Sequence, residues 1–170
     1  MAQRSFFELV RVHEALDECF LLHQEALVTG ELPHAAVLFA DYRDLLHLHI
    51  HHEDNILLPV FARNGRMKRW PPELYTGEHD KLKGFLRRSE AGLQKLIASD
   101  DVKPRDLVAQ IDLEGGLKRL LDHHDQREQE NLFPILDEVT LAAERQQLLD
   151  QCLGEWRTRL AESAFPSSLM

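Results

Sequence analysis

The sequence predicts an all-α fold, an antiparallel up-down-up-down four-helix bundle with an additional C-terminal helix. Apolar residues recur at helical spacing between clear start and stop signals, and the alternating pattern of a strand is almost absent. The connections between the long helical runs are short, which is typical of antiparallel neighbours. With 170 residues and 44% apolar content, the chain fits one domain. We place this domain at residues 1–163 and a C-terminal tail at residues 164–170.

The first two helical runs have recognisable ends. Ser5, followed three residues later by Glu8, forms a capping-box pattern at the start of the first run. That run ends near Gly30. The second run begins at Pro33, because proline is favoured at the first helical positions. It extends to about residue 62.

Proline and polar turn residues also delimit the later runs. An Asn64-Gly65 turn should close the second run, and Pro71-Pro72 opens the third, which stops near Ser99. The fourth run begins at Pro104 and reaches at least Phe133.

A fifth run, residues 140–161, is expected to cover the outside of the bundle. Pro59 and Pro134 fall late in the second and fourth runs. Each should kink or end its helix, because proline lacks the backbone donor and clashes with the preceding turn.

The composition excludes several classes of protein. A net charge of −9 would repel nucleic acid. No stretch approaches the ~20 apolar residues of a membrane span, and the N-terminus has no signal-peptide pattern. Cys19 and Cys152 are far apart and are expected to be core residues in a reducing cytosol, so we expect a soluble, cytoplasmic protein.

A weak internal repeat carries the candidate chemistry. The segments HIHHEDNILLP from His49 and HDQREQENLFP from His124 both fit the pattern His-x3-Glu-x5-Pro. Residues four apart share one helix face, so His49 and Glu53, like His124 and Glu128, can reach one metal centre. Each pair lies among apolar residues, where acids and histidines are costly to bury unless something satisfies them.

Two further histidines fall at matching heights in an antiparallel arrangement. His13 and His49 each lie 16 residues from the connection between their helices. His79 and His124 lie 19 and 20 residues from theirs. At 1.5 Å per residue, the members of each pair agree to within about 2 Å. Each helix is therefore expected to send one histidine inward at a common level.

These motifs resemble the hemerythrin-like (HHE cation-binding) family from about Arg4 to Leu136. The resemblance is carried by the histidine of VRVHEAL, the two repeated motifs and the histidine of GEHDKL. It implies a di-iron site bridged by two carboxylates and an oxo or hydroxo group. The six candidate metal ligands are His13, His49, Glu53, His79, His124 and Glu128.

The sequence departs from the oxygen-carrying hemerythrins at two positions. Their third helix supplies two histidines four apart, whereas here Lys83 follows His79 at that spacing. Their fourth helix places an aspartate five residues after its histidine, whereas Glu128 is four residues after His124. Two six-coordinate irons need about twelve bonds, and four histidines, two bridging carboxylates and one bridging oxygen supply about ten. The open positions indicate ligand binding or reactivity and argue against simple reversible oxygen carriage.

We therefore predict a non-haem di-iron protein that binds, senses or reduces dioxygen or a related small molecule, such as nitric oxide or peroxide. Manganese and zinc stay open, because imidazole and carboxylate suit them too. Two alternatives remain: a di-iron peroxidase or oxidase-like enzyme, and a structural interaction bundle whose histidines are inert.

The remaining polar residues near the motifs are expected to be structural or solvated. These are His23, His34, His47, His51, His52, His123 and Asp17. The alternatives left open are that His52, three residues after His49, contacts a metal ligand and that Asp17, four residues after His13, supplies an extra bond to the metal. Tyr42 and Tyr75 can pack in the core or hydrogen-bond a bound ligand.

Overall fold

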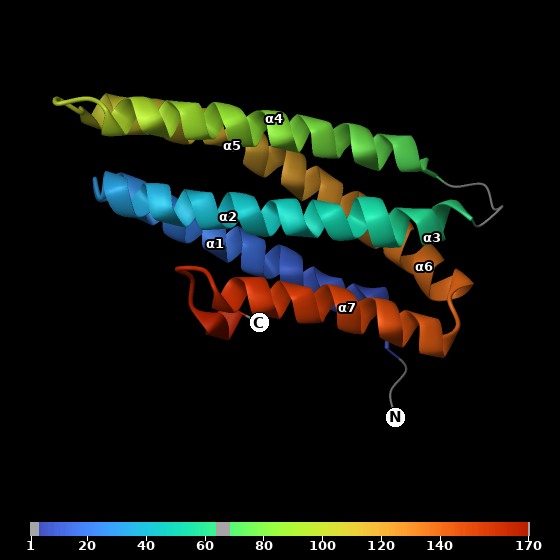
Figure 1. Ribbon diagram of the computed structural model, residues 1–170. Helices are drawn as coiled ribbons and strands as arrows, with labels where there is room; N and C mark the ends of the chain where they lie inside the picture. The colour runs from blue at the N-terminus through green and yellow to red at the C-terminus, as the bar shows by residue number, and fades with distance from the viewer. Residues whose placement is uncertain (1–3, 64–68, 170) are drawn as a thin grey trace.

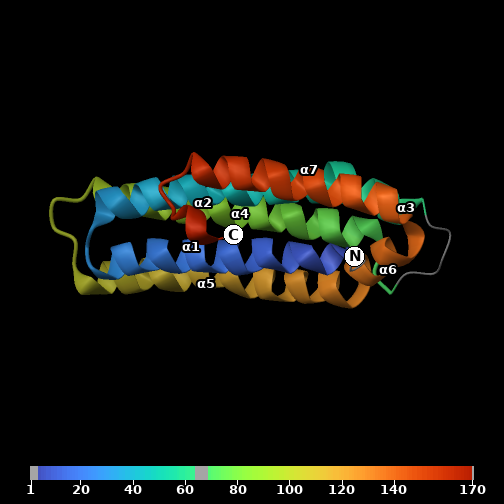
Figure 2. The same ribbon diagram turned by 90° about the horizontal axis from the view of Figure 1, so that it is seen from below.

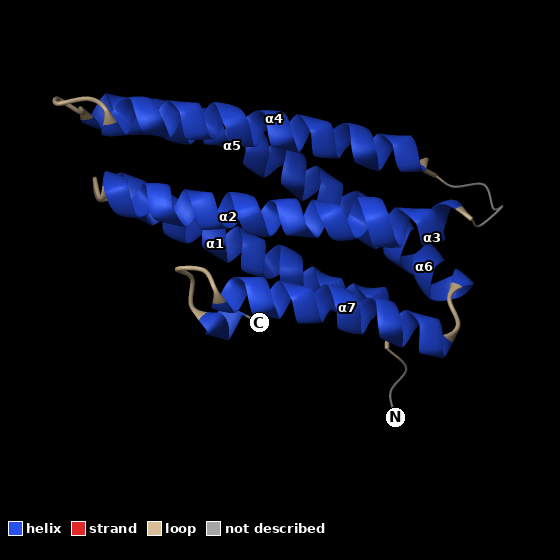
Figure 3. Ribbon diagram, viewed as in Figure 1, coloured by secondary structure: helices blue, strands red, loops and turns tan. Residues whose placement is uncertain are grey.

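The computed structural model describes residues 4–63 and 69–169, and every regular element within them is helical (Figure 3). The long helices α1 (Val10–Val28), α2 (Leu32–His52), α4 (Pro72–Ile97) and α5 (Pro104–Arg127) lie side by side in a bundle-like arrangement (Figures 1 and 2). The other elements are η1 (Phe6–Leu9), η2 (Glu53–Leu57), α3 (Leu58–Ala62), η3 (Glu128–Leu132), α6 (Phe133–Val139), α7 (Ala142–Ala161) and η4 (Ser167–Leu169). The prediction of an all-helical fold is confirmed for the described residues.

Capping and turn residues place the first helix where the sequence predicted it. The Ser5 hydroxyl accepts a hydrogen bond from the Phe7 backbone N–H, and the Glu8 carboxylate accepts one from the Ser5 N–H. This capping box starts η1, which leads directly into α1. Helix α1 ends at Val28 with Thr29 as its C-cap, and Gly30 follows with a φ of 77°. A residue with a Cβ would be strained in that conformation.

The later helices begin at the predicted prolines. Pro33, Pro72 and Pro104 lie in the first turns of α2, α4 and α5. A backbone N–H in the first turn has no intrahelical acceptor, so a proline there costs no hydrogen bond. The Asn64-Gly65 turn lies outside the described residues. No helix of the described part of the chain has the length and apolarity needed to cross a lipid bilayer.

Both late prolines are accommodated in a way that the sequence analysis did not foresee. The chain stays helical through Pro59 and Pro134, so neither proline ends its helix. Instead, a single π-helical turn precedes each one: η2 before Pro59 and η3 before Pro134. A wider turn relieves the clash between the proline ring and the preceding turn. The widened turns begin at Glu53 and Glu128.

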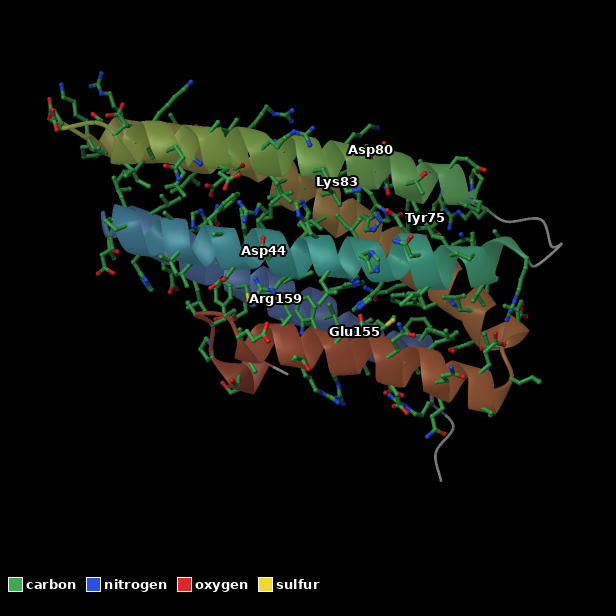
Figure 4. All side chains as sticks on the ribbon, viewed as in Figure 1. Asp44, Tyr75, Asp80, Lys83, Glu155 and Arg159 are labelled. Carbon is green, nitrogen blue, oxygen red and sulfur yellow. The ribbon has the colours of Figure 1, made fainter. Side chains whose placement is uncertain are left out.

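Helix α7 covers one side of α2, as expected for the fifth run. Trp156, Leu149 and Leu160 on α7 are fully buried. At the edge of this contact, Arg159 on α7 donates to an oxygen of Asp44 on α2 at 2.8 Å (Figure 4). Apolar burial and peripheral ion pairs thus hold α7 against the bundle.

The C-terminal segment and the cysteines lie close to the core. Phe165 is buried, and the backbone N–H of Ala164 donates to Asp41 at 2.7 Å. These contacts tie part of the predicted tail to α2, while the domain boundary at residue 163 stays a prediction. Cys19 and Cys152 are both buried free thiols, in agreement with their expected role in the core.

Candidate metal centre

The side chains of the six predicted ligands come together between the helices. His13 lies on α1, His49 on α2, His79 on α4 and His124 on α5, while the two glutamates begin the π turns η2 and η3. All six side chains are at most 5% exposed. Their ligand atoms form two groups that can each hold a metal ion: His13, His49, Glu53 and Glu128, and Glu53, His79 and His124. In each group these atoms lie within 4.8 Å of one another.

The Glu53 carboxylate faces both groups, one with each oxygen. Its Oε1 lies 2.8 Å from His49 Nε2. Its Oε2 lies 2.8 Å from His79 Nε2 and 3.3 Å from His124 Nε2. One carboxylate can therefore bridge two ions.

Glu128 repeats this arrangement from the opposite motif. Its Oε2 lies 3.0 Å from His13 Nε2, and its Oε1 lies 3.3 Å from His124 Nε2. The two carboxylates thus divide the histidines into a pair on α1 and α2 and a pair on α4 and α5. Each pair faces an oxygen from both glutamates, which suits a centre with two ions.

Several of these atoms are close together but do not satisfy one another. His49 Nε2 and Glu53 Oε1 are buried without a hydrogen-bond partner, as are both ring nitrogens of His13 and both oxygens of Glu128. Buried polar atoms are normally paired. Their separations match a different geometry, because neighbouring ligands about 2.1 Å from one ion lie about 3 Å apart. The donor atoms present therefore fit a bound metal.

Acidic side chains orient the remote nitrogens of the α4 and α5 histidines. His79 Nδ1 is 2.6 Å from Asp54 Oδ1, and His124 Nδ1 is 2.9 Å from Glu78 Oε2. A carboxylate on the second nitrogen fixes the tautomer and ring direction of a metal-binding histidine. These contacts fix the two rings with Nε2 directed at the centre.

The α1 histidine is held more loosely. His13 Nδ1 is 3.6 Å from Asp125 Oδ2, too long for a hydrogen bond. Its ring stacks on Phe133, with centroids 5.9 Å apart, and meets the His49 ring edge-on. Apolar and ring contacts position His13.

The sequence analysis missed Asp54, Glu78 and Asp125. Each is adjacent in sequence to a predicted ligand but faces a histidine of another helix. A residue one position away is turned by about 100° around the helix and so points to a neighbouring helix. An acid directly beside each motif residue was the available signal.

The pKa values of Glu53 and Glu128, two buried carboxyl groups close to each other, are shifted in opposite directions. Burial, with the nearby Glu53 carboxylate, raises the pKa of Glu128 to about 8. Burial also acts to raise the pKa of Glu53, but His49, Glu128 and His124 bring it well below its usual value. Without metal, the two carboxylates therefore hold one proton at neutral pH.

Burial acts to lower the pKa of His124, but the nearby Glu128 carboxylate and the hydrogen bonds to Glu53 and Glu78 raise it well above its usual value. Metal binding must displace such protons, because the ligating forms are carboxylate and neutral imidazole. Metal uptake at this centre should therefore release protons.

The remaining histidines lie away from the centre. His34, His47, His51 and His123 are exposed, in agreement with the prediction. His52 is buried and pairs with Glu155 on α7 at 2.7 Å.

His23 belongs to a second buried polar cluster. Its Nδ1 donates to the Ala35 carbonyl at 2.8 Å, and its Nε2 lies 3.0 Å from Glu114 Oε1. Gln24 and Gln110 donate to Glu114 at 3.1 and 2.8 Å. We name these five residues the distal cluster. Its contacts support the structural role predicted for His23.

Asp17 is exposed and does not join either group of ligand atoms. Tyr75 on α4 (Figure 4) accepts a hydrogen bond from Asn131 at 2.9 Å, and its ring meets the His124 ring edge-on. Tyr42 is fully buried, and its hydroxyl has no hydrogen-bond partner. Tyr75 therefore covers the centre, whereas Tyr42 keeps a free polar atom in the core.

Comparisons with protein-family models, with curated proteins and with solved structures found no match. The resemblance to the hemerythrin-like family stays a prediction that rests on the quoted motifs. What the structure adds is independent of any relative: buried histidine and glutamate groups that can hold a metal ion.

Proposed function

We propose that this chain is an antiparallel up-down-up-down four-helix bundle of the hemerythrin-like type with a non-haem di-iron centre. In this proposal the centre binds, senses or reduces dioxygen or a related small molecule such as nitric oxide or peroxide. One observation carries the proposal: buried nitrogen and oxygen atoms of His13, His49, Glu53 and Glu128 face one another without hydrogen-bond partners. An inert structural bundle would leave those atoms unsatisfied, at a cost of about 1–3 kcal/mol each.

The residues have distinct roles in the proposed centre. His13 and His49 would hold one ion and His79 and His124 the other, and the carboxylates of Glu53 and Glu128 are placed to reach both. Bound iron supplies redox chemistry and open positions for a small ligand.

The surrounding residues prepare the site. Asp54 and Glu78 orient His79 and His124, while Phe133 and Tyr75 cover two imidazole rings with aromatic surface. Glu128 holds a proton near neutral pH in the metal-free state, because burial and the Glu53 carboxylate raise its pKa to about 8. This proton must leave before both oxygens of Glu128 can act as ligands.

Iron is the metal we propose, for reasons of ligand type and charge. Imidazole and carboxylate without thiolate disfavour soft metals and suit iron, manganese and zinc. Two ferrous ions carry four positive charges, of which the bridging glutamates balance two. Balancing the rest would require an anionic small ligand from solution, which favours a metal with redox chemistry.

Metal analysis combined with a redox test decides the proposal. Metal-free protein is loaded with ferrous iron without oxygen, desalted, analysed for iron and then exposed to air. We expect about two ions per chain and a new absorption band that appears only with air. The matched variants are Glu53→Ala, which should bind at most one ion and lose the absorption band, and Glu155→Ala, which should keep both signals.

Fewer than about one tightly bound ion per chain after loading would refute the proposal and favour the inert bundle. The same preparation addresses the enzymatic alternative, since repeated turnover of peroxide or dioxygen would identify a catalyst. A single stoichiometric oxidation would identify binding or sensing.

A further inference from the structure

A cleft between α1 and α5 leads from the surface to the His13 side of the candidate centre. It has a volume of about 410 Å³. Its lining includes His13, Glu14, Asp17, Asp122, Asp125 and Glu130. We name it the acidic cleft, because it gathers five carboxylates and its lining contains no lysine or arginine.

Three of these carboxylates are left without a compensating charge in direct contact. Glu130 pairs with Arg69 at 2.9 Å. Glu14, Asp17 and Asp122 form no ion pair or hydrogen bond among residues 4–63 and 69–169. Partial burial of its carboxyl group and the Asp122 carboxylate raise the pKa of Asp17, although Lys118 acts against them. Negative charge thus accumulates at the mouth of the cleft.

His13 points from the cleft into the centre. Its side chain is only 4% exposed, yet neither ring nitrogen has a hydrogen-bond partner. Nδ1 lies on the side of Asp125, at 3.6 Å, and Nε2 lies 3.0 Å from Glu128. A buried imidazole without partners at the inner end of an acidic cleft is suited to receive a cation.

The opposite side of the centre has mixed charge. A cleft of about 570 Å³ between α2 and α4 is lined by Arg43, Lys83 and Arg87, and also by the carboxylates of Asp54 and Glu90. Lys83, labelled on α4 in Figure 4, lies 3.9 Å from Asp54, which holds His79. Arg43 likewise pairs with Glu90. Acids and bases of this cleft thus largely offset one another, whereas the acidic cleft attracts cations, so the two clefts are not equivalent routes.

We propose that the acidic cleft is the route by which divalent cations load the centre. This inference rests on the proposed metal-binding function. Glu14, Asp17 and Asp122 attract the hydrated cation at the surface. The cation then exchanges water ligands for Asp125 and His13, and from there it reaches Glu128.

The physical basis is electrostatic steering. A cleft lined by one sign of charge raises the local concentration of counter-ions and increases association rates by about 10- to 1000-fold. Exposed charges are screened by salt, with a Debye length of about 10 Å at 0.1 M and about 3 Å at 1 M. The loading rate should therefore fall as salt increases, whereas the number of ions bound at equilibrium should not change.

The test follows Co²⁺ loading of metal-free protein by stopped-flow absorption, with the final stoichiometry measured separately. The test variant is Glu14→Gln/Asp17→Asn/Asp122→Asn. The control variant removes the same charge from exposed sites far from the cleft, as Glu25→Gln/Asp100→Asn/Asp112→Asn. All six side chains are exposed, so both variants should fold, and circular dichroism checks this.

At low salt we expect the test variant to load about tenfold more slowly than the unmodified protein. The control should keep the original rate, and the difference should vanish in high salt. Both variants should reach the full stoichiometry. Equal rates for the test and control variants would overturn the inference while leaving the proposed function intact. Failure of the unmodified protein to bind Co²⁺ would instead overturn both.

Discussion

Two clusters of buried histidine and glutamate occur in the same set of helices, and they differ in how their polar atoms are satisfied. In the distal cluster, both nitrogens of His23 and both oxygens of Glu114 have hydrogen-bond partners. In the candidate centre, both nitrogens of His13 and both oxygens of Glu128 have none. The residue types are alike, so composition alone does not separate a structural cluster from a ligand site. Satisfaction of the buried atoms does.

The largest expected effect is that two variants separate the clusters, one by losing metal and the other by losing stability. Glu53→Ala should reduce bound metal from about two ions per chain to one or none, because it removes the bridging oxygens. Glu114→Ala should keep the metal but lower the free energy of unfolding by about 3 kcal/mol, because it leaves buried partners unpaired. Elemental analysis and urea unfolding measure the two effects. If Glu114→Ala also lost metal at normal stability, the clusters would not be independent.

Next in size is the effect of the acids behind the histidines. Glu78→Ala and Asp54→Ala should each weaken metal binding by about 10- to 100-fold, because such partners orient the ligating imidazole. Glu155→Ala is the matched control, because it breaks a histidine–carboxylate pair at His52, outside the centre. Competition with a chelator reports the affinities. An equal loss in the control would show that the effect is general destabilisation.

A smaller effect is expected from pH on the metal-free protein. The folded state holds a proton on Glu128 up to about pH 8, whereas an unfolded glutamate releases it near its usual pKa of about 4.3. The folded state therefore binds more protons between these values, and stability should fall as the pH rises through this window. Thermal unfolding from pH 5 to 9 checks the sign. Glu128→Gln should flatten the dependence, and a rise in stability with pH would contradict the assignment.

The smallest effect concerns Tyr42, whose hydroxyl is buried without a partner. Tyr42→Phe should leave the stability of the metal-free protein unchanged or raise it by about 1 kcal/mol, because no hydrogen bond is lost. If the hydroxyl instead binds a small ligand of the loaded centre, the variant will weaken binding of azide, a diatomic surrogate. A clear loss of stability without metal would show that the hydroxyl has a partner in solution.

The sequence predicted much of this arrangement, because the determining signals are local. The capping box at Ser5, the turn at Gly30 and the prolines at 33, 72 and 104 set the helix boundaries. The repeated His-x3-Glu spacing and the matched heights placed six polar residues on inward faces, and the structure brings them together. Whether these residues bind metal stays a prediction.

Other features depend on contacts between helices, which local patterns do not encode. Asp54, Glu78 and Asp125 each contact a histidine of a neighbouring helix. Predicting their roles therefore requires knowing how each helix is oriented about its axis relative to its neighbour. The π turns were also missed. A proline late in a helix predicts a disturbance, but the choice between an end and a widened turn depends on which side chains are held in the core.

These widened turns have a consequence for the spacing of the chain. A π turn contains one residue more than an α turn, and one residue corresponds to a rotation of about 100°. Deleting a single residue within 53–57 and returning to an α turn would remove this extra residue, so the helix after it would keep its phase. Val60 and Phe61 would stay buried. The ring of Pro59, however, would again meet a narrow preceding turn, so the extra residue serves the accommodation of the proline rather than the direction of the residues beyond it.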